Sequence, residues 1–144
     1  MTIDDYDHVF QLWSSIDGFG IRSIDDSKEG VHKFLLRNPE LSIVATQDKH
    51  IIGTVLCGHD GRRGCLYHVC VDPMFRRQGV GKTMVIQAMQ ALQKEGINKV
   101  ALIAFTKNDV GNSFWNTIGW LQRTDLNYYE FSLNDENITR FIHA

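Results

Sequence analysis

The chain has 144 residues, 43% of them hydrophobic and 22% charged, which is enough for one domain with a sizeable core. Its formal net charge of −2 argues against a general nucleic-acid-binding protein, because such proteins usually carry a surplus of basic residues. No window approaches the roughly eighteen apolar residues of a transmembrane helix, and the acidic N-terminus is unlike the basic start of a signal peptide. We therefore predict a single domain over residues 1–144 that binds neither nucleic acid nor membrane.

The first half of the chain contains two amphipathic helix patterns followed by three strand patterns. Apolar residues at helical spacing predict a helix over residues 4–15. Ser27 is a suitable N-cap for a second helix that runs to about Arg37. Apolar runs separated by tight polar turns then predict strands over 41–46, 51–57 and 65–71.

The second half alternates helices and strands. A long helix is expected over 79–95, a strong strand over 99–105 and a short helix over 110–118. Two last strands are expected over 120–123 and 128–133, and the tail from Asn134 has a weakly helical pattern. This order predicts the α/β (α+β) class, with a mixed central sheet flanked by helices. The sheet should be antiparallel on one side and have a helical crossover on the other.

The stretch over residues 69–82 is the most informative part of the chain. An apolar run ends in Asp72-Pro73, a basic pair follows, and two glycines then lead into the long helix. The first N–H groups of a helix have no intrahelical partner and lie at the positive end of its dipole. Glycines also let an anion approach the backbone closely. The pattern therefore predicts a site for a phosphate-bearing cofactor.

The cysteine and histidine residues do not suggest a metal site or disulfides. Cys57, Cys65 and Cys70 are an odd number without CxxC spacing, which favours buried free thiols in a reducing cytoplasm. The six histidines are scattered without metal-ligand spacing. We therefore expect a cytoplasmic protein without a bound metal.

Two motifs in this order resemble those of the GCN5-related N-acetyltransferases. The first is Arg76-x-x-Gly79-x-Gly81 between a strand and a long helix, which is similar to the family's acetyl-CoA-binding motif. The second runs from Asn108 through Trp115 to Gly119-Trp120 and is similar to the family's Asn…Tyr…Gly-Phe segment. Residues 4 to about 133 follow the family's order of elements, so a single domain of this family is expected.

The resemblance implies direct transfer of an acetyl group from acetyl-CoA, the co-substrate, to a primary amine. It implies that the strand at residues 69–71 faces the pantetheine arm and is splayed from its parallel neighbour, while the turn binds the pyrophosphate through backbone N–H groups. Asn108 would contact the cofactor near the pantetheine. The cofactor-binding set is then Val69, Cys70, Val71, Arg76, Arg77, Gln78, Gly79, Val80, Gly81, Lys82, Asn108 and Trp115.

The chain departs from the family pattern in two places. The family's first strand usually precedes the first helix, yet here it is absent or reduced to Thr2-Ile3. Many members carry a tyrosine at the position of Trp115, and that tyrosine protonates the leaving thiolate. An indole N–H has no useful acidity, so Trp115 is not the general acid.

The proton-transfer residues are less well specified. Candidate bases are Tyr67, His68, His59 and Asp60, and His68 is preferred because imidazole titrates near neutral pH. Tyr67 and His68 are adjacent in a strand, so we expect only one of them to face the cofactor side. Tyr128 and Tyr129 are the candidates to replace the missing acid, and Tyr129 is the one we select. No base is visible in sequence beside Cys70, so a covalent acetyl-enzyme is not expected.

Several function classes stay open from the sequence. The acceptor is either a small amine or a protein N-terminus or lysine, and acidic residues around the loop after the first helix favour a cationic acceptor. The alternative to an enzyme is a non-catalytic acyl-CoA-binding module, which Trp115 motivates. A homodimer is one assembly that the sequence allows.

Overall fold

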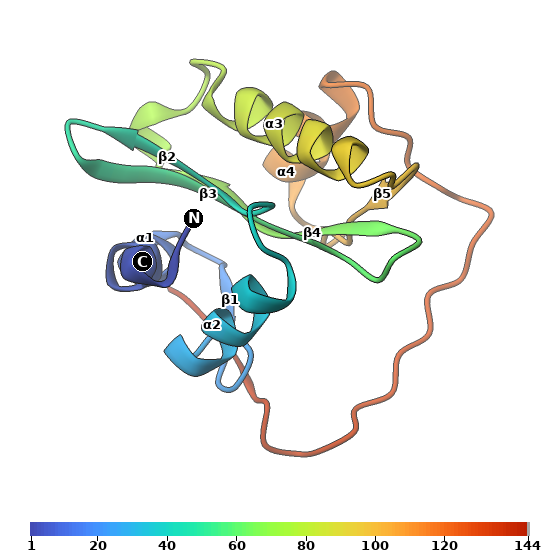
Figure 1. Ribbon diagram of the computed structural model, residues 1–144, viewed down its shortest axis with the longest axis horizontal. Helices are drawn as coiled ribbons and strands as arrows, with labels where there is room; N and C mark the ends of the chain where they lie inside the picture. The colour runs from blue at the N-terminus through green and yellow to red at the C-terminus, as the bar shows by residue number, and fades with distance from the viewer. Residues whose placement is uncertain (144) are drawn as a thin grey trace.

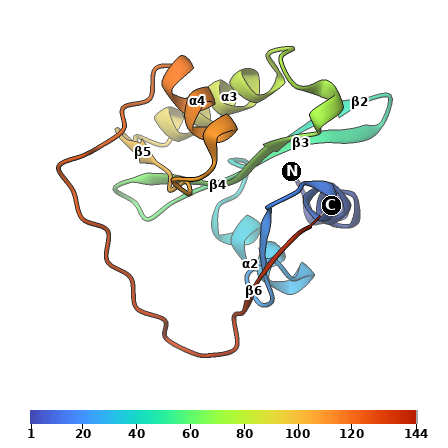
Figure 2. The ribbon, with the colours of Figure 1, turned by 180° about the vertical axis from the view of Figure 1, so that it is seen from behind.

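The computed structural model describes residues 1–143 and consists of a four-stranded sheet, a two-stranded sheet and four α-helices (Figures 1 and 2). The larger sheet has the strand order β2-β3-β4-β5, and the smaller pairs β1 with β6. The strands are β1 (Gly20–Arg22), β2 (Ile43–Gln47), β3 (His50–His59), β4 (Gly64–Val71), β5 (Val100–Ala101) and β6 (Thr139–Phe141). The helices are α1 (Tyr6–Ser15), α2 (Lys28–Arg37), α3 (Val80–Lys94) and α4 (Asp109–Thr117), with short 3₁₀ turns at η1 (Ile3–Asp5) and η2 (Pro73–Phe75).

Local signals in the sequence set the helix boundaries as expected. The Ser27 hydroxyl accepts a hydrogen bond from the Gly30 N–H at 3.0 Å and so caps α2. Gly96 and Gly119 follow α3 and α4 with φ of 78° and 93°, the left-handed conformation that ends helices. The first four predicted helices are confirmed to within two residues at their ends, apart from the η1 turn before α1.

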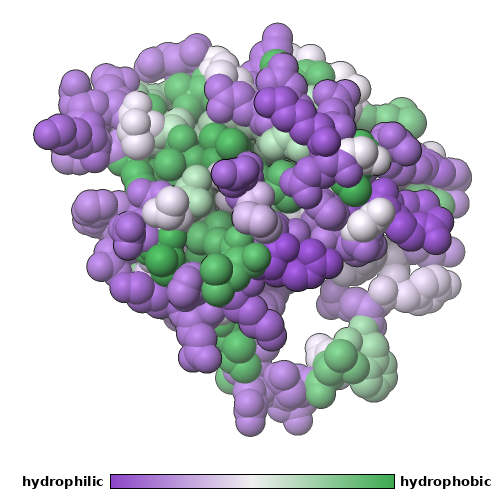
Figure 3. All heavy atoms as spheres, viewed as in Figure 1, coloured by the Kyte–Doolittle hydropathy of each residue, from purple (hydrophilic) through white to green (hydrophobic). Residues whose placement is uncertain are grey.

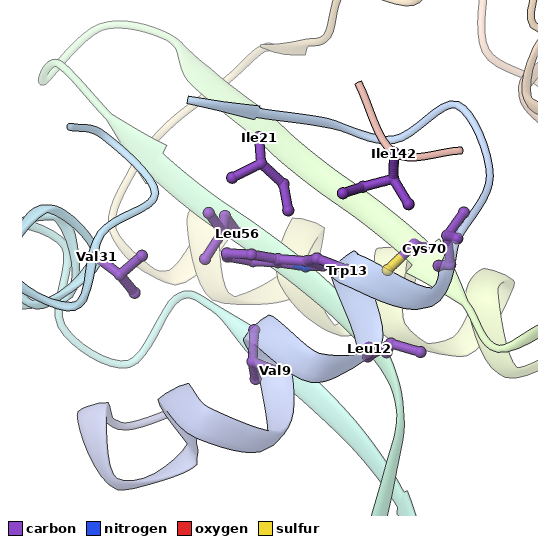
Figure 4. Packing of buried hydrophobic residues seen from close by; sticks show 9 residues of the cluster. Val9, Leu12, Trp13, Ile21, Val31, Leu56, Cys70 and Ile142 are labelled. Atoms are coloured by element: carbon purple, nitrogen blue, oxygen red, sulfur yellow. The ribbon is translucent and has the colours of Figure 1, made fainter. Parts of the chain in front are cut away.

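The larger sheet separates two hydrophobic cores. On one face α1 packs against the sheet with Val9 and Trp13 fully buried, together with Ile21 of β1 and Ile142, which follows β6 (Figure 4). On the other face α3 covers the sheet with Met84, Val85, Ala88 and Leu92. Two cores on opposite faces hold the sheet between helical layers, so its strand edges, rather than its faces, remain for binding.

The sheet has the predicted mixed topology. β2, β3 and β4 are antiparallel, and β4 pairs with β5 in parallel across the α3 crossover. The predicted strand over 99–105 is much shorter than expected, because it pairs with β4 at two positions, Gly64↔Val100 and Cys65↔Ala101. Beyond Ala101 the chain turns away from β4. Residues 102–105 therefore form no hydrogen-bonded ladder, although their composition favours a strand.

Three expectations for the last quarter of the chain are wrong, whereas the expected absence of a strand before the first helix is confirmed. Residues 120–123 and 128–133 form no strand within the described residues. Instead, residues 121–137 form a long connection without helix or strand that stands away from the body until Glu136 and Asn137 bond the residues before α2 (Figure 1). The tail is a strand, β6, rather than a helix, because β1 offers it a backbone partner at Gly20↔Phe141. At the other end η1 takes the place of the strand considered at Thr2-Ile3, and no strand precedes α1 in residues 1–143. None of the helices in this range has the length and apolar character needed to cross a membrane.

Candidate active site

A β-bulge in β4 shapes the centre of the site. Thr54 lies opposite Cys70 and Leu56 lies opposite Tyr67, so one residue of β3 faces two residues of β4. His68 is the inserted residue, and its φ of 49° is in the left-handed region. Side chains of strand residues normally alternate, but a bulge interrupts that alternation.

The bulge overturns the expectation that Tyr67 and His68 face opposite sides of the sheet. Tyr67 makes an edge-to-face contact with Phe34 of α2, with ring centroids 5.9 Å apart. His68 lies against Trp13 of α1, with centroids 4.7 Å apart. Both side chains therefore lie on the α1 and α2 side of the sheet.

His68 forms a close pair with Asp26, which precedes α2. The His68 Nε2 and Asp26 Oδ1 atoms are 2.8 Å apart, and the two side chains are 13% and 5% exposed. The other carboxylate oxygen of Asp26 accepts the Arg22 N–H at 2.7 Å. A carboxylate is an acceptor, so this contact assigns the ring proton to Nε2 and leaves the lone pair on Nδ1. The sequence indicates Asp26 only as one of the acidic residues around the loop after the first helix, because nothing local shows its contact 42 positions away.

Aromatic rings and a hydroxyl fix the orientation of His68. Phe19 lies 4.7 Å from the imidazole centroid, and Trp13 lies at the same distance. The Thr54 hydroxyl donates to the His68 carbonyl at 2.8 Å and accepts the Trp13 Nε1–H at 3.0 Å. The imidazole is therefore held on three sides, as a positioned proton-transfer group requires. Thr54 was not singled out from the sequence, which carries no local signal for this role.

Cys70 lies next to this network but its thiol is buried. Its side chain belongs to the core around Trp13, and its Sγ lies 3.2 Å from the Thr54 hydroxyl. Burial raises the pKa of the Cys70 thiol to about 11. The thiol is therefore protonated at neutral pH and is a poor nucleophile. Any contact of Cys70 with a cofactor would come from its backbone.

We expect Cys70→Ala to retain more than half of the wild-type activity, because the protonated, buried thiol has no part in a direct transfer. The measurement is steady-state CoA release at saturating substrates. The native thiol should also resist alkylation at pH 7 until the protein is unfolded. Near-complete loss of activity with intact acetyl-CoA binding would contradict this expectation and indicate a covalent intermediate.

The edge of β4 is open where the predicted cofactor residues lie. Its parallel pairing with β5 covers Gly64 and Cys65, and the register continues no further toward Val71. Val69 and Val71 pack their side chains toward the α3 core. The backbone groups of residues 66–71 on this edge are therefore available to an extended ligand, which is the splayed geometry expected for a pantetheine arm.

The glycine turn joins this open edge to the start of α3. Gly79 caps the helix with φ of 82°, and the first helical hydrogen bond runs from the Thr83 N–H to the Gly79 carbonyl at 3.0 Å. The preceding N–H groups therefore project from the helix end, which has no acidic residue in its first turn. The Arg76 Nε–H donates to the Val71 carbonyl at 3.1 Å and ties the turn to β4.

The two glycines have different roles. A side chain at Gly79 would meet no atom within 4 Å, so this glycine serves its backbone conformation and leaves the space before the helix open. A Cβ at Gly81 would lie 3.3 Å from the Phe114 ring. Gly81 therefore also lets α3 and α4 approach closely, a packing role that the sequence did not reveal.

Asn108 and Trp115 have clear structural roles. The Asn108 side chain accepts the Gly111 N–H at 3.0 Å and caps α4. Trp115 packs between Phe114 and Trp120, with ring centroids 4.9 and 4.8 Å away. The tryptophan thus forms part of the α3 and α4 core, and contact with a cofactor remains a prediction for both residues.

The other candidate acids and bases lie elsewhere. His59 contacts Glu95 beyond the end of α3 at 2.9 Å, and Asp60 accepts the N–H groups of Arg62 and Arg63 in the β3–β4 turn. These contacts give both His59 and Asp60 a structural role. Tyr129 is 86% exposed on the long connection. The structure therefore does not bring Tyr129 into contact with His68.

Two hollows of about 400 Å³ each lie on the α1 side of the molecule. One lies between α1 and the β2–β3 turn and includes Asp72 and Phe75. The other lies between α1, β1 and β6 and includes Asp26. Neither is lined by residues of β4, so neither contains the open strand edge where the pantetheine arm is predicted.

A splayed strand edge, a glycine turn and a helix start thus occur together. Comparison with known proteins identifies the family to which the chain belongs. The model of the acetyltransferase (GNAT) family matches residues 6–120. The chain belongs to this family. An acetyltransferase of Pectobacterium atrosepticum is 31% identical over 106 residues, which cover 74% of each chain.

Solved structures confirm the fold of this GNAT acetyltransferase. Ard1 from Thermoplasma volcanium is 20% identical and superposes with a TM-score of 0.73 over 100% of this chain and 95% of its own. The acetyltransferase AAC(6')-Iy, in complex with the bisubstrate analogue CoA-S-monomethyl-acetylneamine, is 19% identical with a TM-score of 0.69, covering 92% and 95% of the two chains. The predicted family and fold class are therefore confirmed. Among residues 1–143 no group of histidine, cysteine or acidic side chains is arranged to hold a metal ion.

Proposed function

We propose that this acetyltransferase transfers an acetyl group from acetyl-CoA directly to a primary amine. The observation that carries the proposal is the continuous path from the open edge of β4 through the Gly79 turn to the start of α3. An extended pantetheine arm fits the strand edge, and a pyrophosphate fits the unpaired N–H groups beside Arg76, Arg77 and Lys82. Membership of the GNAT family supports acetyl-CoA as the co-substrate.

The thioester would then lie beside residues 69–71, next to the bulge. A backbone N–H at this edge can polarise the thioester carbonyl in the manner of an oxyanion hole. The attacking amine must be neutral, and His68 is the positioned base that accepts its proton, directly or through water. Asp26 holds the imidazole in the tautomer whose Nδ1 takes that proton.

The leaving thiolate needs a proton that Trp115 cannot supply. Tyr129 is our proposed donor, and its place on the long connection means that this part of the site forms only when the connection is docked. A thiol is acidic enough for the thiolate to be a tolerable leaving group at neutral pH. The acid is therefore less critical than the base.

The acceptor is a primary amine, either a small molecule or a protein N-terminus or lysine. The similar structure of AAC(6')-Iy with a bisubstrate analogue of acetylneamine supports a small polar amine. The acidic loop between α1 and α2, with Asp17, Asp25 and Asp26, supports a cationic acceptor.

The test is CoA release measured across a panel of polyamines, amino sugars, aminoglycosides, amino acids and peptides with free N-termini or lysines. We expect turnover on at least one amine, with kcat/KM at least 100-fold higher for the preferred class than for the other. The same panel without protein serves as the background. Tight binding of acetyl-CoA with no turnover on any acceptor would contradict the enzymatic proposal and favour an acyl-CoA-binding module.

A further inference from the structure

The 121–133 segment, which connects α4 toward β6, presents large apolar side chains to solvent. Figure 3 shows apolar groups at the lower right, where this connection stands away from the body. The large apolar residues of the segment are 62–93% exposed: Leu121, Leu126, Tyr128, Tyr129, Phe131 and Leu133. Monomeric proteins seldom expose apolar residues so densely on one segment, and such a surface marks an interaction site.

The second part of the segment has the pattern of an amphipathic strand. Tyr129, Phe131 and Leu133 alternate along the chain and are 86%, 88% and 93% exposed. The alternate positions, Tyr128, Glu130 and Ser132, carry polar groups, and the Tyr128 hydroxyl bonds the Glu130 carboxylate at 3.0 Å. Contacts between residues two apart are those of an extended chain, whose alternate side chains share a face. The segment is therefore already extended, and its apolar face packs against neither hydrophobic core of residues 1–143.

Both ends of the segment are held by the body of the same chain. Before it, the Trp120 N–H donates to the Trp115 carbonyl at 2.9 Å. After it, the Ile138 N–H donates to the Ser23 hydroxyl at 2.9 Å, and β6 pairs with β1. With its ends anchored and its middle outside, the segment forms no ladder with the described residues of its own chain.

A complementary free edge exists on β5. The chain from Leu102 to Phe105 reads as a strand, yet in residues 1–143 it forms no ladder, and Ile103 and Phe105 are 69% and 63% exposed. Lys99 and Lys107 flank this edge, whereas the 121–133 segment carries one arginine and two acidic residues. An unpaired edge and an unpaired apolar strand of opposite charge are matched surfaces.

We propose that the partner of the 121–133 segment is a second copy of this chain, in a symmetric dimer in which each segment adds to the β5 edge of the other copy. Because both surfaces lie on one chain, a two-fold axis satisfies both at once. The two aromatic residues of the apolar face, Tyr129 and Phe131, bury roughly 150–250 Å² each. With the leucines, the area per copy is on the order of the 800 Å² that stable interfaces use. The dimer would also fix Tyr129, which the proposed function needs.

The first test is the oligomeric state of the full chain by light scattering and sedimentation, independent of activity. We expect twice the mass of one chain for the wild type and a monomer for Phe131→Asp, which charges the apolar face. Ser132→Asp is the matched control, because it puts the same charge on the polar face of the same segment and should remain dimeric. A monomeric wild type, or a dimeric Phe131→Asp variant, overturns the proposal.

The second test keeps Phe131, so it does not depend on whether the Phe131→Asp variant folds. Backbone amides of residues 128–133 in the wild type should be protected from hydrogen exchange at high protein concentration, and the protection should fall on dilution. A bismaleimide should join Ile103→Cys in one chain to Ser132→Cys in another, in a Cys65→Ser background. Exchange at the rate of an unfolded chain, or linkage within single chains only, overturns the proposal.

Discussion

His68→Gln should lower kcat by about 100-fold, because a positioned general base contributes about 10²–10⁴ to the rate. The KM for acetyl-CoA should change little, since the imidazole lies on the α1 side of the sheet and outside the glycine turn. The dependence of kcat on pH that an imidazole base imparts should also be lost. Steady-state kinetics over a range of pH, with circular dichroism to confirm folding, measure these effects.

His59→Gln is the matched control for this prediction. His59 also lies on the large sheet and contacts a carboxylate, that of Glu95, at 2.9 Å. Its replacement should leave kcat within about twofold, because we assign it no chemical role. Equal losses in both variants, or an unchanged kcat in His68→Gln, would exclude His68 as the base.

Asp26→Asn separates positioning from proton transfer. Asparagine retains the size of aspartate but cannot hold the imidazolium that forms when His68 takes a proton. We expect kcat to fall by at least about tenfold, because an amide at this position can hold the imidazole in the wrong tautomer, as it does at the orienting carboxylate of Ser-His-Asp sites. The pH profile should keep an imidazole-dependent limb, since His68 is still present. A general loss of folding would appear in circular dichroism and would not change the shape of that profile.

Gly79→Val should weaken acetyl-CoA binding by at least tenfold. Gly79 has φ of 82°, which a β-branched residue adopts only at a cost of about 1–3 kcal/mol. A valine side chain would also stand in the space before the unpaired N–H groups of α3, where we place the pyrophosphate. Isothermal titration with acetyl-CoA measures the dissociation constant directly.

Gly61→Val provides the control for backbone strain. Gly61 has φ of 90° in the β3–β4 turn, and a side chain there would likewise meet no atom within 4 Å. Both variants should lose similar stability on thermal unfolding, but only Gly79→Val should lose affinity. If both bind acetyl-CoA as the wild type does, the Gly79 turn is not the cofactor site.

Features that depend on neighbours in sequence were predictable from the sequence. The Ser27 cap, the glycine that ends α3 and the glycine turn before it are local, because each depends on the conformational preferences of a few consecutive residues. The same residues carried the resemblance to the GNAT family, which the family match over residues 6–120 confirms. The cofactor half of the candidate site is built almost wholly from such local features.

The proton-transfer half depends on contacts that no local pattern encodes. The bulge at His68 arises from the register of β3 against β4, and it reverses the face that strand alternation predicts for one of the two adjacent residues. Asp26 reaches His68 across 42 positions, and Thr54 links it to Trp13. These contacts form only because α1 and the residues that lead into α2 pack against the large sheet.

The sequence by itself determined the helices, the family and the glycine turn, because propensity, caps and motif spacing act over short distances. Only the tertiary structure decided which of the predicted strands form. Residues 120–123 and 128–133 have the composition of strands, but a strand forms only where a backbone partner is in reach. The tail pairs with β1, while the 121–133 segment, anchored at both ends, forms no ladder within residues 1–143.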